Sequence, residues 1–309
     1  MSSTINLEKA VGVELDVEPV AWNTRDLLLY AVGIGAKKDD LAMVYELDKH
    51  FAPFPTYPVV LPLKGESQEL NVFRERVHER RVAGLPRFDP NRGVHGSQSI
   101  EILKPLPTVS GAGWKMRRRI VESGIIIETE SVLEDASGVV YAKLFSGSFN
   151  VGAKATGQRF SKAIAAPPAA KPPPKDRKPD WVFTDKTSPE QAILYRLSGD
   201  YNPLHIDPTI GKAANFGGVI LHGLSTFGFV ARGILTEVGG GDPNGLRYFG
   251  VRFTSPVRPG DALETSVWEI GPVGGGFTEV AFVTKDVTSG KICLGNGVAY
   301  IKKIEKSKL

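Results

Sequence analysis

Residues 222–241 read HGLSTFGFVARGILTEVGGG, and this stretch decides which kind of fold the chain can form. Apolar residues recur along it at the spacing of one helical face, namely Leu224, Phe227, Ala231, Ile234, Leu235 and Val238. That spacing predicts a helix, and the neighbouring Phe229 and Val230 widen its apolar face, so we expect the helix to be buried. Three glycines at 239–241 end it.

Four strand-like runs follow this helix, at residues 247–257, 262–270, 277–287 and 291–304. Turn residues separate them, including Pro259-Gly260-Asp261, Gly274-Gly275-Gly276 and Ser289-Gly290. One long buried helix followed by an antiparallel sheet predicts an α+β architecture in which the sheet wraps round the helix.

The first half of the chain resembles the second in the order of its elements. Tyr30 corresponds to Tyr195, and Trp114 corresponds to Trp268. Strand-like runs again close the half, at residues 94–103, 112–122, 124–133 and 139–150. The repeated order predicts that the two halves are distant copies of one unit.

The first half lacks the residues for a long central helix. Pro53, Pro55, Pro58 and Pro62 occupy the corresponding region, and each interior proline removes a backbone hydrogen bond and clashes with the preceding turn. The first sheet is therefore expected to have a concave face without a helix. Either a loop or an elongated apolar ligand fills that space.

A proline-rich segment divides the chain nearly in half. Residues 154–179 read KATGQRFSKAIAAPPAAKPPPKDRKP, with six prolines between Pro167 and Pro179. This composition favours extended polyproline conformations over a packed core. We expect an N-terminal repeat at 1–153, a semi-rigid linker at 154–180 and a C-terminal repeat at 181–306.

The composition of the 309-residue chain narrows the classes of function. Its formal net charge of +4 suits an anionic small molecule and is too weak to indicate nucleic acid as a partner. No stretch approaches about 18 consecutive apolar residues, so membrane insertion is not expected. Cys293, the single cysteine, is expected in the core. The chain ends in Ser307-Lys308-Leu309, the tripeptide of a receptor-read peroxisomal address.

The densest group of polar residues lies at 195–207, which read YRLSGDYNPLHID. Asn202-Pro203 breaks the preceding helix, and the resulting turn can bring Asp200 and His205 towards one point. A carboxylate and an imidazole around one water form an acid/base pair. The alternative is structural, because Asp and Asn commonly satisfy backbone groups after a helix and His205 could be a buried, hydrogen-bonded histidine.

The start of the long helix is a second candidate site. Gly223 lies where backbone N–H groups are unpaired and the helix dipole is positive, so an oxygen gaining negative charge would be stabilised there. Alternatively, Gly223 only permits tight packing. His222 could cap the helix, and Ser225 and Thr226 could contact a ligand or cap the backbone. The spacing of these histidines and aspartates does not favour a metal site, and none is expected.

These motifs resemble a known family. Residues 195–208, YRLSGDYNPLHIDP, followed by GGVILHG at 217–223, resemble the hydratase 2 signature of MaoC-like enoyl-CoA hydratases. The N-terminal half resembles the degenerate repeat of eukaryotic peroxisomal hydratase 2 proteins, and the size and terminal tripeptide are most similar to plant forms. The resemblance implies a double hotdog with one antiparallel sheet from each repeat. It also implies a long central helix in the C-terminal repeat only, and acyl-chain accommodation in the N-terminal repeat.

The resemblance implies a reversible, (R)-specific hydration of trans-2-enoyl-CoA in peroxisomal fatty-acid oxidation, including degradation of unsaturated fatty acids, without a cofactor. Asp200 and His205 match the catalytic pair, Asn202 matches the polar residue between them, and Gly223 matches the oxyanion donor. Gly35 stands in the first half at the position of Asp200, so one active site per chain is expected.

The remaining expectations concern binding. The acyl-CoA substrate is expected to contact Asn202, His222, Ser225 and Arg258, although Arg258 could equally be a turn residue. The peroxisomal import receptor and a second copy of the chain in a homodimer are the expected partners. The alternative functions are a hotdog acyl-CoA thioesterase and an acyl-CoA binding module without catalysis.

Overall fold

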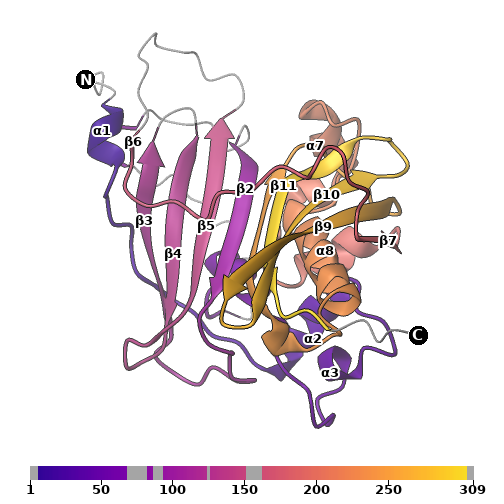
Figure 1. Cartoon of the computed structure of the whole chain (residues 1–309). Helices are drawn as coiled ribbons and strands as arrows, with labels where there is room; N and C mark the ends of the chain where they lie inside the picture. Colours follow the sequence, from indigo (N-terminus) through magenta and orange to yellow (C-terminus); the bar gives the residue numbers. More distant parts are fainter. Residues whose placement is uncertain (1–5, 68–81, 86–92, 124–125, 151–161, 305–309) are drawn as a thin grey trace.

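The computed structural model describes residues 6–67, 82–85, 93–123, 126–150 and 162–304. Figure 1 shows one long twisted sheet, with the longest helix, α8 (Gly223–Glu237), lying against its C-terminal half. This α+β arrangement confirms the predicted class. Among the described residues, no helix has the length and apolarity needed to cross a membrane.

Helix α8 forms the centre of the core, as its apolar pattern predicted. Its residues from Leu224 to Leu235 are all buried. The helix ends where the glycines begin, and the N–H of Gly241 donates to the carbonyl of Leu235 at 2.9 Å. Gly228 is required within the helix, because a Cβ there would lie 2.2 Å from Ile34 of the first repeat. The two repeats therefore meet along this helix.

Each repeat contributes four main strands in the same order. The first repeat supplies β2 (Gly93–Ile102), β3 (Lys115–Ser123), β4 (Ile127–Glu134) and β5 (Val140–Asn150). The second supplies β8 (Leu246–Phe253), β9 (Ala262–Gly274), β10 (Phe277–Asp286) and β11 (Ile292–Ile301). The spatial order β3-β4-β5-β2-β8-β11-β10-β9 is symmetrical about its centre, which is the arrangement that duplication produces. The short strands β1 (Glu18–Pro19) and β6 (Lys162–Ala163) pair with β3, and β7 (Trp181–Lys186) pairs with β9.

The sheets of the two repeats are joined edge to edge. Strands β2 and β8 pair antiparallel, with Ser97 opposite Arg252 and Ile100 opposite Phe249. The expected sheets, one per repeat, are joined by this pairing into a single continuous sheet. The pairing covers what would otherwise be two exposed sheet edges, those of β2 and β8. It also fixes the position of one repeat relative to the other.

A loop with short helical turns fills the place of the missing first-repeat helix. It contains the 3-10 turn η1 (Tyr57–Val60) and the short helix α4 (Leu61–Lys64), whose residues from Tyr57 to Leu61 are buried. Of the two alternatives, the loop is what fills this space. A cavity of about 320 Å³ lies at its margin, lined among others by Pro53, Phe54 and Tyr141.

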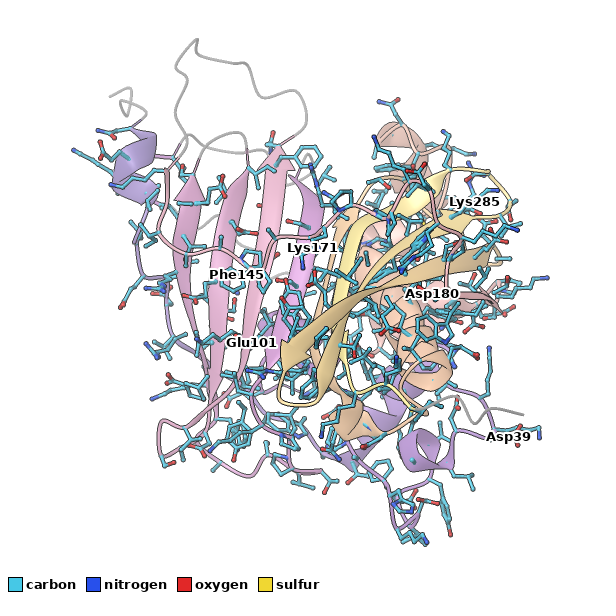
Figure 2. All side chains as sticks on the ribbon, viewed as in Figure 1. Asp39, Glu101, Phe145, Lys171, Asp180 and Lys285 are labelled. Atoms are coloured by element: carbon cyan, nitrogen blue, oxygen red, sulfur yellow. The ribbon has the colours of Figure 1, made fainter. Side chains whose placement is uncertain are left out.

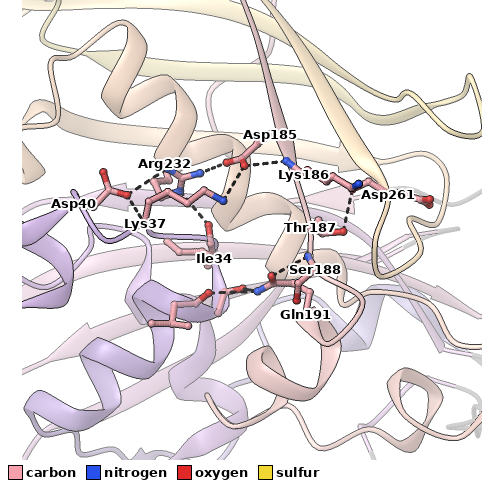
Figure 3. Close-up of polar contacts among 12 residues, drawn as sticks. Ile34, Lys37, Asp40, Asp185, Lys186, Thr187, Ser188, Gln191, Arg232 and Asp261 are labelled. Carbon is pink, nitrogen blue, oxygen red and sulfur yellow. Dashed lines mark hydrogen bonds and ion pairs between the residues drawn. The ribbon is translucent and has the colours of Figure 1, made fainter.

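Side chains from both repeats pack together and form hydrogen bonds beside α8. The other α-helices of the described residues are α1 (Leu7–Ala10), α2 (Thr24–Gly33), α3 (Leu41–Val44), α6 (Gln191–Arg196) and α7 (Pro208–Ala213). Corresponding helices α2 and α6 pack together, with the rings of Tyr30 and Tyr195 6.2 Å apart. Figure 3 shows Arg232 of α8 between Asp40 and Asp185, with its Nε donating to the carbonyl of Ile34 at 3.2 Å.

Residues 164–180 cross the open face of the sheet as an extended segment (Figure 1). Lys171 pairs with Glu279 of β10 at 2.6 Å, and Figure 2 shows Lys171 over the same face as Phe145. Part of the expected linker, residues 154–161, lies outside the described residues. Cys293 is buried, as predicted.

Candidate active site

A glycine turn presents the polar cluster at the end of α6. Gly199 has φ +124°, and a Cβ there would lie 2.7 Å from the side chain of Lys64, so another residue would be strained and crowded. Asn202 then caps the short turn η3 (Pro203–His205), its Oδ1 accepting from the N–H of Leu204 at 3.0 Å. The chain reverses within these residues and brings Asp200 back towards His205.

The structure brings Asp200, His205 and His222 together. One carboxylate oxygen of Asp200 and one ring nitrogen of each histidine all lie within 4.8 Å of one another. The Nδ1 of His205 is 2.9 Å from the carbonyl of Ile220, and a carbonyl only accepts, so this nitrogen carries the proton. The Nε2 of His205 is then left with a lone pair when the ring is neutral. Asp200 is partly exposed and His205 is 8% exposed, so both border a space that water can reach.

His222 is a structural member of this cluster. It is fully buried, its ring stacks on that of His205 at 3.8 Å, and its Nε2 donates to the carbonyl of Asp200 at 3.0 Å. Burial, with a smaller contribution from His205, holds the pKa of His222 well below its usual range. His222 therefore stays neutral and fixes the backbone of Asp200, instead of contacting substrate as sequence analysis predicted.

The same three side chains are also the group of described residues that could hold a metal ion, since two imidazoles and a carboxylate are a common ligand set. Sequence spacing gave no indication of this grouping, because Asp200 and His222 meet only after the intervening loop folds back. The expectation that the site works without a metal stays a prediction.

Gly223 is the accessible residue at the start of α8. It is partly exposed, whereas Leu224, Ser225 and Thr226 behind it are buried. The first N–H groups of a helix have no partner within it and lie at the positive end of its dipole. The ring of Phe253 lies in front of Gly223, and a Cβ on Gly223 would be 3.2 Å from that ring. This site can therefore accept an oxygen that gains negative charge.

Two other predicted contacts fall in different places. Ser225 is fully buried and its hydroxyl donates to the carbonyl of Gly33 at 3.1 Å, so it ties α8 to the first repeat and is not placed to bind substrate. Arg258 is exposed, and its Nη2 donates to the carbonyl of Phe216 at 3.4 Å. The neighbouring Val257 pairs with Leu221, which places Arg258 beside the loop leading to Gly223.

A histidine from the other repeat also lies near this site, and it was not predicted from the sequence. His95 on β2 packs its ring against Phe253 at 4.8 Å, and the charge of Asp200 acts on its pKa. No motif marks this residue. It reaches the site only through the pairing of β2 with β8, whose register cannot be read from either strand alone.

Comparison with known proteins shows which family the chain belongs to. The model for the MaoC like domain matches residues 170–291, and the model for the MFE-2 hydratase 2 N-terminal domain matches residues 21–122. A probable enoyl-CoA hydratase 2 from Dictyostelium discoideum is 33% identical, and the match covers 99% of this chain and 100% of that protein. The chain belongs to the MaoC-like family of hydratases and dehydratases.

Other members of the MaoC-like family agree with this result. A peroxisomal enoyl-CoA hydratase 2 from Arabidopsis thaliana is 34% identical over 86% of this chain and 88% of that protein. The crystal structure of a MaoC-like dehydratase from Phytophthora capsici superposes with a TM-score of 0.85 at 36% identity, covering 98% of this chain and all of that one. The predicted family and double-hotdog fold are confirmed.

Proposed function

We propose that this MaoC-like protein catalyses the reversible hydration of trans-2-enoyl-CoA to (3R)-3-hydroxyacyl-CoA. One observation carries the proposal: the carboxylate of Asp200 lies beside His205, whose proton position is fixed by the carbonyl of Ile220. The names of the relatives from Dictyostelium and Arabidopsis support the same reaction and the same class of substrate.

The proposed mechanism begins with the thioester carbonyl. Its oxygen docks at the N–H of Gly223, which withdraws electron density from the conjugated double bond and makes C3 electrophilic. A water held between Asp200 and the Nε2 of His205 attacks C3, and Asp200 accepts one of its protons. That proton then goes to C2 on the same face, so one water is added and no charge remains. The thioester itself is the electron sink, so no cofactor is required.

We assign two further substrate contacts from the exposure and the hydrogen-bonding groups of the side chains. Asn202 is partly exposed, and its side-chain N–H groups can donate to the water or to the new hydroxyl, since its oxygen is used for capping. The exposed guanidinium of Arg258 suits a CoA phosphate.

We assign the acyl chain to the N-terminal repeat, where the loop at 51–64 replaces a long helix. The cavity beside that loop is lined by Ile102, the last residue of β2, together with Phe54 and Tyr141.

We further propose that the protein works in peroxisomes, in fatty-acid oxidation that includes degradation of unsaturated fatty acids, and that it forms a homodimer. The Arabidopsis relative carries that compartment in its name. Ser307, Lys308 and Leu309, the residues expected to bind the import receptor, lie outside those that the structure describes. The proposed division into repeats 1–153 and 181–306 follows the symmetrical strand order.

The test follows the loss of enoyl-thioester absorbance with trans-2-butenoyl-, decenoyl- and hexadecenoyl-CoA, together with chiral analysis of the product. We expect turnover and a (3R) product. A parallel thiol-release assay separates the thioesterase alternative, which predicts free CoA and no hydroxyacyl product. If the protein binds acyl-CoA but forms neither hydroxyacyl-CoA nor free CoA, the hydratase proposal is refuted and the binding-module alternative is supported.

A further inference from the structure

A contact between two partly exposed aromatic rings, those of His95 and Phe253, connects the N-terminal repeat to the residues beside the start of α8. His95 of β2 hydrogen bonds through Nε2 with the hydroxyl of Ser146 on β5, at 3.0 Å. Its ring lies 4.8 Å from that of Phe253, at an interplanar angle of 54°. This bond and this contact hold the imidazole between the two repeats, at the join of β2 with β8.

Phe253 carries this contact onward to Gly223. The ring of Phe253 lies so close that a Cβ on Gly223 would be 3.2 Å from two of its carbons. Phe253 is the last residue of β8 and is partly exposed, and its ring lies on the Cβ side of Gly223 at the start of α8. Any movement of this ring would therefore change the space beside Gly223.

We propose that His95 is a positioning residue for the hydration reaction, an inference that rests on the proposed function. By packing against Phe253, His95 holds the ring in place and so fixes the approach of the thioester carbonyl to Gly223. The repeat that lacks the catalytic motif thus shapes the active site of the other repeat. Displacement of a reacting group by about 1 Å costs on the order of a hundredfold in rate, so a packing residue can have a large effect.

His95 acts through its shape and not by transferring protons. The polar groups around it are Ser146, the backbone of Ser97, the side chain of Gln98 and the carboxylate of Asp200. Burial dominates and lowers the pKa of His95 to about 4, although each of the last three raises it. The ring is therefore neutral throughout the pH range in which a hydratase would be assayed.

Three substitutions at His95 test the proposal in steady-state hydration assays. We expect His95→Ala to lower kcat by about 10- to 100-fold while KM changes less than about threefold, because the contact acts on alignment. His95→Phe keeps a ring against Phe253 and should recover most of the rate. His95→Gln keeps a hydrogen bond to Ser146 without the ring and should recover less. His50→Ala removes an exposed histidine remote from this contact and serves as the matched control.

These experiments distinguish failure of the proposed hydratase function from failure of the proposed role of His95. If wild type does not hydrate any enoyl-CoA, the proposed function fails. If wild type is active and His95→Ala retains its kcat within about twofold, only the role of His95 fails. Recovery of kcat in His95→Gln but not in His95→Phe would also overturn the role of His95 as a packing residue. So would the loss of one limb of the pH–rate profile in His95→Phe, since that would show proton transfer by His95. Should His95→Ala not fold, Phe253→Leu removes the same contact from the other side and must show the same loss of kcat.

Discussion

The substitution Gly223→Ala tests the oxyanion site by adding one methyl group and removing nothing. The new Cβ would lie 3.2 Å from the ring of Phe253, so the ring or the start of α8 must move by a few tenths of an ångström. Overpacking of this kind costs about 1–3 kcal/mol. Since the strain falls on the N–H that is proposed to bind the thioester oxygen, we expect most of it to appear in the barrier. This corresponds to a loss of kcat of roughly 10- to 100-fold.

The assay for Gly223→Ala is hydration of trans-2-decenoyl-CoA, with thermal unfolding measured in parallel. Gly245→Ala is the matched control, because a Cβ at that position meets its nearest neighbour at an ordinary 3.6 Å. Combining Gly223→Ala with Phe253→Leu relieves the crowding, and the interaction energy in the double-mutant cycle should be of the same size as the loss. If Gly223→Ala shows wild-type kcat and KM, the thioester oxygen does not bind at the start of α8.

Three further results follow from the contacts described above. Arg232→Met removes the buried partner of Asp40 and Asp185. Asp185 keeps its ion pair with Lys37 at 3.3 Å, and the two carboxylates are 21% and 17% exposed, so we expect a loss of about 1–3 kcal/mol by urea unfolding, below that of an uncompensated buried charge. A loss below about 1 kcal/mol would show that the network does not hold the repeats together. Ser225→Ala should lower the free energy of unfolding by about 0.5–1.5 kcal/mol and leave KM unchanged, because the Gly33 carbonyl still accepts from Gln191 at 2.8 Å. A raised KM with unchanged stability would return Ser225 to substrate binding. The pKa of His95 falls from 6.5 in an exposed histidine to about 4, so between these pH values the unfolded chain binds a proton that the folded chain does not. Stability should therefore fall as pH falls from 7 to 5, less steeply in His95→Phe, and equal slopes would contradict the lowered pKa of His95 in the folded chain.

The long helix and the strands could be predicted because their signals are local. The apolar spacing from Leu224 to Val238, followed by glycines, defines α8 to within a residue of its observed end. The four prolines from Pro53 to Pro62 forbid a matching helix, and the structure has only short turns there. Both results depend on backbone rules that act within a few residues.

The parts that could not be predicted depend on contacts between distant residues. The pairing of β2 with β8 joins segments about 150 residues apart, and nothing in either strand specifies that partner. For the same reason His95 was missed, and Ser225 was given to the substrate although its hydroxyl bonds to Gly33 of the other repeat. Asp200 and His205 were found because a turn of five residues brings them together within one segment.

In the proposed mechanism the carboxylate of Asp200 removes a proton from water, and Asp200→Asn tests this step most directly. The amide keeps the size of the side chain and can still accept from the N–H of Asn202, so the fold should be unchanged. Asp207→Asn is the matched control, because Asp207 caps α7 through Thr209 and asparagine caps a helix equally well. We measure hydration of trans-2-decenoyl-CoA by both variants. The mechanism predicts a loss of at least about a hundredfold in kcat for Asp200→Asn, with Asp207→Asn close to wild type. Wild-type kcat in a folded Asp200→Asn protein would contradict it.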